Sequence, residues 1–419
     1  MKISKRSLLG GAVASVLPSG WVAAHAAAEQ AGAPKLDRIQ IENIVRRSYQ
    51  YVAMYNVINK GAMAPGALST GGWNKLKRNT VLADADVKII ARPNNDTLYQ
   101  NAELDLREEA VVFDLPAIDS KFVSLECSAY DHYVTIPTST RQGDYRKPQK
   151  LLFYTKRTKG YRAEKIQGID RYLEMTGDFA TAFHRVMPHA NEPERYKRIV
   201  SQIEAIKLMT LSEFLGRAPK PATDAAFPAY GKTDEDIFGT NLLDVMQFVF
   251  NHTTFSEKDA LDRAVLAAYE PLGIAPGNKW DPAKAAHIDN EQFRQVAEDV
   301  QKANMAIMLD AAKSAPYLLR LFRPKGQMDL DALVFQSVVG PIGNPAEEAV
   351  YPPVVTADGK PMNALHDYVI EMSKADLPPA KAFWSLTLYD TKNGFFIPNP
   401  ARNIRWARTP ATSLTTMAA

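Results

Sequence analysis

The clearest strand pattern in the chain runs over residues 97–106, directly after a short polar turn. Apolar and polar residues alternate along it, so that one face carries Leu98, Ala102, Leu104 and Leu106. This period of two predicts a half-buried strand. The turn at 93–96 has the sequence Pro-Asn-Asn-Asp, and these residues favour turns because proline fixes φ while Asn and Asp bond their own backbone. A polar turn leading into a sheet edge is a suitable place for a binding site.

Further short strands are expected before residue 156, separated by turn residues such as Pro116 and Gly143. They cover residues 110–115, 121–129, 133–136 and 151–155. Because no helical pattern lies between them, they favour an antiparallel β-sandwich.

Apolar residues at three- and four-residue spacings predict helices elsewhere in the chain. The first covers 35–60 and ends before Gly61, and residues 170–314 are predicted to be helical. The helices expected in this middle part lie at 196–206, 242–249, 261–269 and 293–307. A linker at 218–231 contains three prolines. Strand patterns return in the last third, at 332–339, 350–355 and 382–390.

These elements predict an α+β multidomain protein. Its expected parts are a helix plus an antiparallel β-sandwich at 35–169, a helical domain at 170–314 and a partial jelly-roll β-sandwich at 315–419.

Residues 1–26 are expected to be a signal peptide. Three basic side chains lie in the first six residues, a mildly apolar run covers 8–24, and Ala-His-Ala at 24–26 is a small-residue cleavage site. The segment 4–9 also resembles a twin-arginine signal with Lys in the first basic place, so both export routes remain open. The apolar run is too short for a membrane span, and we expect a periplasmic or secreted protein rather than an integral membrane protein.

The charge balance argues against two classes of partner, nucleic acid and anionic lipid. The chain has 50 basic and 47 acidic residues, a net charge of +3, and removal of the three basic residues of the signal gives +3 − 3 = 0. Such a protein has no net attraction to nucleic acid or to anionic lipid. Cys127 is the only cysteine, so an internal disulfide is impossible and stability must come from the buried core.

No standard catalytic signature is found in the sequence. His184 and His189 are five residues apart with Pro188 between them, which does not match the spacing of a helical metal pair. There is also no glycine-rich phosphate loop and no Gly-x-Ser-x-Gly motif. We therefore expect no metal and no cofactor, and ordinary hydrogen-bonded histidines.

Asp131 breaks the pattern of its strand. At 121–129 the odd positions form the apolar face and include Cys127, an expected core thiol, and continuing the alternation places Asp131 on that face. An unpaired buried carboxylate is costly, so either the strand bends at Tyr130 or a partner holds Asp131, with Arg92 as the candidate.

Two segments resemble bacterial families. PNNDTLY from Pro93, followed by VVFDLP and by Tyr130-Asp131, is similar to the family called domain of unknown function 1254. LPPAKAFWSLTLYD at 377–390, followed by Asn399-Pro400, resembles its companion, domain of unknown function 1214. The resemblance implies an N-terminal β-sandwich and a C-terminal jelly roll that is shorter here than in the family, and it assigns no activity.

We expect the polar turn and the Tyr130-Asp131 pair to meet in one cleft that binds or processes a small molecule. The candidate catalytic groups are Asp96 and Asp131, and the candidate substrate-binding residues are Arg92, Asn94, Asn95, Tyr99 and Tyr130. The alternative is a non-catalytic envelope interaction protein that acts as a homo-oligomer and covers its β edges by self-association. The sequence leaves open whether the protein is an enzyme.

Overall fold

The computed structural model has mixed α+β content, with antiparallel pairing in its sheets. It describes residues 36–66, 68–88, 91–279, 281, 283, 288–360, 362–363, 365–373, 375–390 and 393–398, and the backbone of 405–408. The expected signal peptide and the Asn399-Pro400 motif lie outside these residues. Within them, no helix combines the length and the apolar character that a bilayer crossing needs.

A five-stranded sheet forms the centre of the molecule, with the strand order β1-β2-β8-β4-β5 and antiparallel pairing throughout. Its strands are β1 (Lys75–Arg78), β2 (Leu98–Asp105), β8 (Phe179–Val186), β4 (Val123–Ala129) and β5 (Val134–Ser139). All residues of β2, β4 and β8 are buried, so both faces of the sheet are covered in its middle.

A four-stranded sheet packs against one face of the first. Its strands are β7 (Arg171–Glu174), β6 (Gln149–Tyr154), β3 (Val111–Leu115) and β9 (Lys207–Thr210), in that order. Only the β6–β7 pair of this sheet is parallel. Both sheets contribute to one hydrophobic cluster, which contains Leu104, Leu125, Cys127, Phe113 and Phe153. The predicted apolar face of β4 is thereby confirmed, and burial raises the pKa of the Cys127 thiol well above its ordinary range, as for an inert core thiol.

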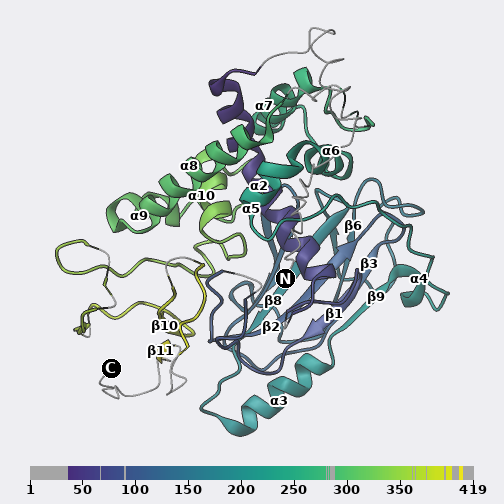
Figure 1. Cartoon of the computed structure of the whole chain (residues 1–419). Coiled ribbons are helices and arrows are strands. Elements are labelled where there is room, and N and C mark those ends of the chain that lie inside the picture. Colours follow the sequence, from purple (N-terminus) through teal and green to yellow (C-terminus); the bar gives the residue numbers. More distant parts are fainter. Residues whose placement is uncertain are drawn as a thin grey trace, which may run out of the picture.

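Most of the helices gather above one end of the two sheets (Figure 1). The long helix α2 (Arg38–Met63) starts in this group and runs onto the five-stranded sheet, where it contacts β2 and β8. Around it lie α5 (Asp234–Thr240), α6 (Leu242–His252), α7 (Ala260–Tyr269), α8 (Asn290–Met308), α9 (Ala311–Leu318) and α10 (Leu330–Val339). The other helical elements of the described residues are η1 (Thr140–Gln142), α3 (Pro193–Glu204), α4 (Leu211–Phe214) and η2 (Glu270–Leu272).

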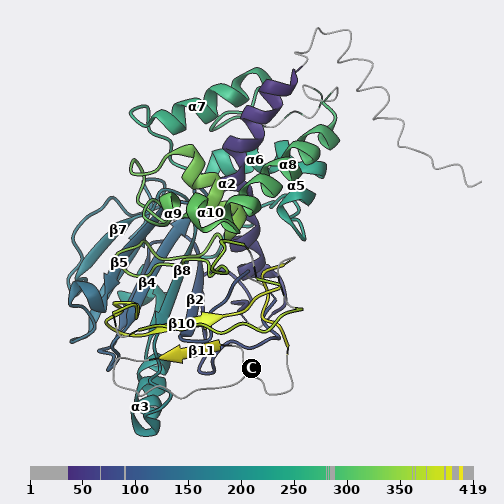
Figure 2. The same cartoon turned by 90° about the vertical axis from the view of Figure 1, so that its left-hand side faces the viewer.

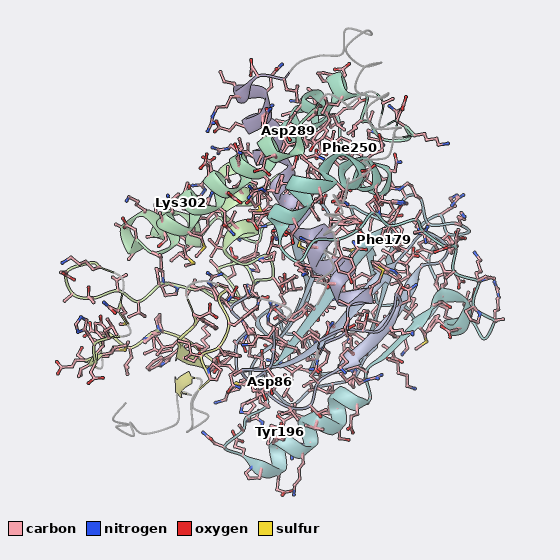
Figure 3. All side chains as sticks on the ribbon, in the orientation of Figure 1. Asp86, Phe179, Tyr196, Phe250, Asp289 and Lys302 are labelled. Atoms are coloured by element: carbon pink, nitrogen blue, oxygen red, sulfur yellow. The ribbon has the colours of Figure 1, made fainter. Side chains whose placement is uncertain are left out.

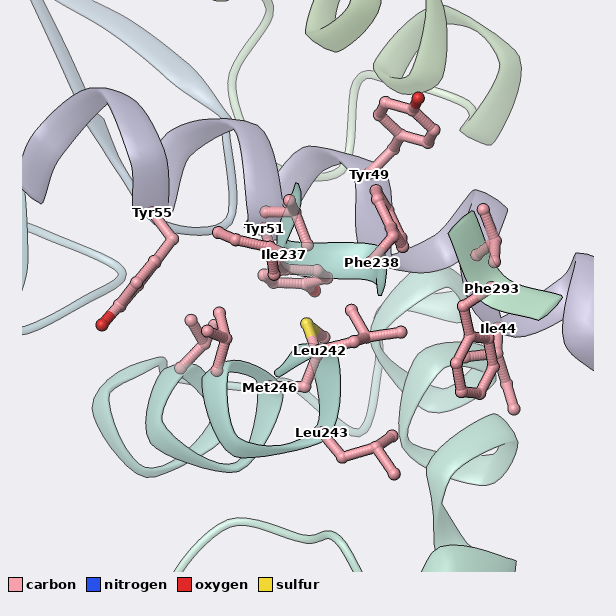
Figure 4. Close-up of a cluster of buried hydrophobic side chains, with 14 of the residues drawn as sticks. Ile44, Tyr49, Tyr51, Tyr55, Ile237, Phe238, Leu242, Leu243, Met246 and Phe293 are labelled. Atoms are coloured by element: carbon pink, nitrogen blue, oxygen red, sulfur yellow. The ribbon is translucent and has the colours of Figure 1, made fainter. Parts of the chain in front are cut away.

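A second hydrophobic cluster joins α2 to these helices (Figure 4). Tyr49 of α2 packs on Phe238 of α5 with their ring centroids 4.9 Å apart, and Met246 of α6 is fully buried beside them. The α2 helix begins at a capping box in which Asp37 accepts a hydrogen bond from the backbone of Gln40. Predicted helices at 35–60, 196–206, 242–249, 261–269 and 293–307 correspond to α2, α3, α6, α7 and α8.

Two predictions about secondary structure before residue 340 were wrong. Residues 170–314 were predicted to be helical, yet this range also contains β7, the central strand β8 and the edge strand β9. In β8 the apolar positions Ala180 and Ala182 suit a helix equally well, and pairing on both sides decides for a strand. Residues 332–339 were predicted to be a strand, but the structure shows that they belong to the helix α10. Asp329 caps this helix, and the helix packs against α2.

The C-terminal segment crosses the side of the sheets (Figure 2). It contains a two-stranded antiparallel sheet of β10 (Trp384–Thr387) and β11 (Arg405–Arg408). The strand expected at 350–355 is not formed, and only part of the one expected at 382–390 is present as β10. Phe396 of this segment packs with Tyr99 and Phe183, so the segment lies against the end of the sheet where β2 begins.

Candidate functional site

The polar turn and the Tyr130-Asp131 pair lie at opposite ends of the five-stranded sheet. Leu98, which follows the turn, pairs with Val186, and Val186 also pairs with Val123 at the start of β4. Tyr130 follows the other end of β4. At about 3.3 Å per residue, the length of β4 separates the two groups by roughly 20 Å. The single cleft expected from the sequence is therefore not formed.

The turn is held by its own backbone and side chains. The Asn94 side-chain oxygen accepts hydrogen bonds from the backbone N–H groups of Asp96 and Thr97, each at 3.0 Å. The Tyr99 hydroxyl accepts from the Asn94 N–H at 2.6 Å, and Asn95 donates to the carbonyl of Ala83. These contacts fix the turn geometry and orient the first residues of β2.

The turn also anchors the C-terminal segment. Ser385 of β10 donates its hydroxyl to Asp96 at 2.6 Å, and the Tyr389 hydroxyl donates to the carbonyl of Pro93 at 2.8 Å. Arg92 donates to the carbonyl of Val339 and contacts neither Asp96 nor Asp131 in the hydrogen bonds and ion pairs of the described residues. Burial lowers the pKa of Arg92, although Tyr389 and Asp390 act in the opposite direction.

Tyr130 and Asp131 have separate environments. The Tyr130 hydroxyl accepts a hydrogen bond from Asn59 of α2 at 3.0 Å, and its ring is fully buried. Asp131 accepts from the Thr176 hydroxyl at 2.8 Å and lies 3.4 Å from the ammonium group of Lys325. The expected partner of the buried carboxylate was thus wrong, because Lys325, and not Arg92, holds it.

The outer face of the five-stranded sheet is polar and nevertheless buried. The strand register places its side chains in rows across β2, β8 and β4: Asp105 and Phe179; Glu103, Thr181 and Ser128; Asn101, Phe183 and Glu126; Tyr99, Arg185 and Ser124. The charges in the third and fourth rows are paired, since Arg185 donates to Glu126 at 2.5 Å. The backbone N–H of Gly343 also donates to Glu126, at 3.2 Å.

Glu103 is the carboxyl group on this face that keeps its proton. Burial raises its pKa from the ordinary value of 4.5 to about 8, although hydrogen bonds from Thr181 and Asn101 act in the opposite direction. Its Oε2 atom has no hydrogen-bond partner among the described residues. Gly61 of α2 lies directly on the carboxyl, and a Cβ atom at that position would come within 2.4 Å of Oε1. Glycine therefore allows α2 to approach the sheet at this point.

An aspartate–histidine pair lies at the end of the same sheet, in the row of Phe179. His252 ends α6, and its Nδ1 atom is 2.9 Å from Oδ2 of Asp178, which directly precedes β8. Arg157 donates to Asp178 at 3.0 Å and the Thr155 hydroxyl donates at 3.2 Å. Burial alone would raise the pKa of Asp178, but the hydrogen bonds from His252 and Arg157 hold it below its ordinary value.

The two members of this pair differ in exposure. The side chain of Asp178 is 4% exposed, whereas that of His252 is 20% exposed. The Nε2 atom of His252 has no hydrogen bond to any residue in the described part of the chain. The imidazole is therefore fixed on its Nδ1 side and available on its Nε2 side.

Aromatic rings surround the His252 imidazole. The ring centroids of Phe248 and Phe179 lie 4.5 Å and 5.0 Å from that of the imidazole. Trp73 packs on Phe179 at 4.8 Å, and Phe227 stacks on Trp73 at 5.4 Å. Phe179 is fully buried while Trp73, Phe227 and Phe248 are half-buried. We call Asp178, His252 and these four aromatic residues the His252 site; Figure 3 shows Phe179 where the helices meet the sheet.

No short motif marks the His252 site in the sequence. Asp178 and His252 are 74 residues apart, and His252 is one of several dispersed histidines. The only sequence signal is the aromatic composition of α6, which fits a core helix equally well. Among the described residues, no three His, Cys, Asp or Glu side chains gather in a way that could hold a metal ion.

Two segments of the chain match known families. Residues 73–209 match the family described as "Protein of unknown function (DUF1254)", and residues 348–416 match "Protein of unknown function (DUF1214)". The chain carries both of these domains, in this order. The resemblance inferred from the sequence motifs is confirmed.

The DUF1254 and DUF1214 segments are in contact, because the Asp96–Ser385 hydrogen bond joins them. DUF1254 contains the whole five-stranded sheet and Asp178 of the His252 site. His252 lies between the two matched segments, on the helices that cover the sheet. Neither family description assigns an activity.

A solved structure shares the fold. The VPA0106 protein from Vibrio parahaemolyticus has a TM-score of 0.61 and 18% sequence identity, with 88% of this chain and 84% of that chain covered. An uncharacterised protein from Burkholderia cenocepacia has a TM-score of 0.25 and 12% identity, with 71% of this chain and 59% of that chain covered. No curated protein matches the chain.

Glu103 makes the stability of the fold depend on pH. Its folded-state pKa of about 8 lies above the ordinary 4.5, so the folded chain holds one proton more than the unfolded chain between these pH values. Stability therefore falls as pH rises through this window, by up to about 5 kcal/mol for a fully buried group. Glu103→Gln, which resembles the protonated acid, should flatten this fall and stabilise the protein at pH 8.5.

Urea unfolding at pH 5, 7 and 8.5 measures the effect. Glu257, which is exposed, provides the control, and Glu257→Gln should keep the wild-type dependence on pH. A Glu103→Gln variant that loses stability between pH 5 and 8.5 as steeply as the wild type would show that Glu103 is ionised in the folded protein.

Proposed function

We propose that this chain is an exported enzyme that hydrolyses small, largely apolar or aromatic molecules, with His252 as the general base. The observation that carries this proposal is the Asp178–His252 pair, in which the carboxylate holds Nδ1 while Nε2 remains available beside half-buried aromatic rings. A buried carboxylate that orients an imidazole in this way is a recurring device for proton transfer in enzymes.

The proposed step is the activation of a water molecule. The Asp178 carboxylate accepts a hydrogen bond from the Nδ1–H group and so favours the tautomer whose lone pair is on Nε2. Nε2 takes a proton from water while the water oxygen attacks the carbonyl carbon of an ester or amide. The same proton then passes from His252 to the leaving alcohol or amine. Arg157 keeps Asp178 ionised, which stabilises the imidazolium formed in between.

The surroundings of His252 favour an apolar substrate. Trp73, Phe227 and Phe248 offer ring faces for stacking, each half-buried. The nearby arginines are already paired, Arg107 with Asp105 at 2.8 Å and Arg157 with Asp178 at 3.0 Å. These two arginines therefore offer no unpaired positive charge to a negatively charged substrate.

The proposal includes the finer predictions of fold and location. We take the two packed sheets as a β-sandwich and the C-terminal segment as part of a jelly roll, in keeping with the shared core of the sheets. Residues 1–26 are proposed to direct export by either route and to place the protein in the periplasm or outside the cell. N-terminal sequencing of the protein recovered from the periplasm tests this, and an uncleaved cytoplasmic chain would contradict it.

Hydrolysis of a panel of aryl and alkyl esters and amides by the purified mature chain tests the activity. His252→Asn should lower kcat/KM by a factor of about 10² to 10⁴, the usual contribution of a general base. Asp178→Asn should lower it as well, because the imidazole loses its orientation. His366→Asn, at an exposed position in the C-terminal segment, is the control and should keep full activity.

Two results would contradict the enzymatic proposal. One is hydrolysis of any panel member that survives His252→Asn in a folded variant. The other is the absence of turnover for every ester and amide of the panel.

A second candidate function is self-association as a non-catalytic envelope protein. It is favoured by large apolar side chains exposed on the C-terminal segment, where Leu365, Val369 and Leu388 are 86%, 85% and 68% exposed. One of them, Val369, lines a surface hollow of about 550 Å³ together with Val354 and Met362. A second copy of the chain that covers this surface would remove the apolar area from water.

Light scattering after size exclusion measures this association. If the second candidate holds, the wild-type chain is an oligomer and Leu365→Ser with Val369→Ser shifts it to the monomer, because the apolar contact is lost. Leu319→Ser, at a 66% exposed position outside this surface, should leave the oligomer intact. A monomeric wild-type chain at micromolar concentration would rule out this candidate.

A further inference from the structure

Three distant segments of the chain bring a lysine between two aspartates. Asp131 follows β4, Asp262 lies in α7, and Lys325 lies between α9 and α10. The Lys325 Nζ atom is 2.8 Å from Oδ2 of Asp262 and 3.4 Å from Oδ2 of Asp131. The side chains of Asp131 and Asp262 are 0% and 1% exposed and that of Lys325 is 18% exposed. The three groups form a buried cluster, which we call the Lys325 cluster.

The cluster is enclosed by aromatic rings and carries excess negative charge. The Lys325 ammonium group lies 5.5 Å from the ring centroid of Tyr133 and 5.8 Å from that of Phe255. Two carboxylates and one ammonium group leave a net charge of −1. Burial raises the pKa of Asp262. Burial also acts to lower the pKa of Lys325, but the carboxylates of Asp131 and Asp262 outweigh it and raise that pKa above its ordinary value. Holding three charges away from water costs free energy, which only partly returns as attraction between them.

The two aspartates are not equivalent. Asp131 accepts a hydrogen bond from Thr176 at 2.8 Å. Asp262 accepts a hydrogen bond on Oδ2 from the backbone N–H of Ser256 at 2.7 Å, and its Oδ1 atom has no partner among the described residues. Asp262 thus has its carboxyl carbon close to the amine, one oxygen held by a backbone donor and the other oxygen unattached.

We propose that Lys325 and Asp262 condense to an intramolecular amide, with Asp131 as the proton carrier. The Lys325 ammonium group first gives a proton to Asp131, and the neutral Nζ attacks the carboxyl carbon of Asp262. Asp131 passes this proton to Oδ1 as the new C–N bond forms, so that the remaining negative charge is on Oδ2 and is stabilised by the Ser256 N–H. Oδ1 then leaves as water with one proton from Asp131 and one from the amine.

The atoms of this reaction balance without any co-reactant. One ammonium and one carboxylate become one amide and one water molecule, and Asp131 returns to its starting state. Fixed proximity of this kind replaces a bimolecular encounter and reaches effective concentrations of about 10⁵ to 10⁸ M.

Such a link suits a chain that cannot form an internal disulfide. Cys127 is the only cysteine and it is buried. The amide would join α7 to the segment before α10 covalently. Asp131, at the end of β4, would lie beside this link. It is independent of the reaction proposed for the His252 site, since it uses none of that site's residues.

Peptide mapping of the purified full chain by mass spectrometry tests the proposal. The expected result is a branched peptide that joins the segments of Lys325 and Asp262, lighter than their sum by one water molecule. Lys313 and Asp310 provide an internal control, because their 2.9 Å ion pair has a similar distance but a lysine side chain that is 68% exposed. This exposed pair should remain unlinked in the same map.

Two variants separate the chemistry from folding. Lys325→Arg keeps the charge and cannot form the link, so its peptides should have their unmodified masses. Asp131→Asn removes the proton carrier and should abolish the link in a chain whose circular dichroism matches the wild type. Recovery of Lys325 in an ordinary linear peptide of the wild-type chain would overturn the proposal, and so would a link that persists in Asp131→Asn.

Discussion

Burial of a polar sheet face is the constraint on which the rest of this structure depends. One face of the five-stranded sheet is apolar and packs on the second sheet, whereas the other carries Glu103, Glu126 and Arg185 away from water. Buried polar groups are costly unless they are paired or neutral. The chain meets this requirement in two ways, with an ion pair between Glu126 and Arg185 and with a proton retained on Glu103.

The same constraint explains how the helices and the C-terminal segment are arranged. Gly61 lets α2 lie directly over the Glu103 carboxyl, and Gly343 brings a backbone donor to Glu126. The polar turn before β2 completes the cover by binding Ser385 of the DUF1214 segment through Asp96. In the His252 site the imidazole is held by a buried carboxylate and is itself 20% exposed. The site thus belongs to the junction of the sheet and the helices.

The sequence pattern predicted the parts of this fold that are decided locally. The alternation in β2 and β4 assigned their apolar faces correctly, and helical spacing located α2, α6, α7 and α8. It failed at β8, because the strand is decided by pairing with neighbours on both sides and not by its own sequence. The sequence pattern also led to the wrong partner for Asp131, Arg92. The true partner, Lys325, lies 194 residues further along the chain, and no local pattern indicates the contact. The Asp178–His252 contact is equally non-local. The one prediction beyond local structure that was confirmed is the resemblance to the two families.

The central claim is that β8 lies in the middle of a sheet that is covered on both faces. Native-state hydrogen exchange of the backbone amides in Phe179–Val186 tests it most directly, because amides in such a strand open only when the whole domain unfolds. The account predicts that these amides are among the slowest in the protein and that their exchange follows global stability as urea is added. Exchange in β8 as fast as in the half-buried edge strand β7 would contradict it.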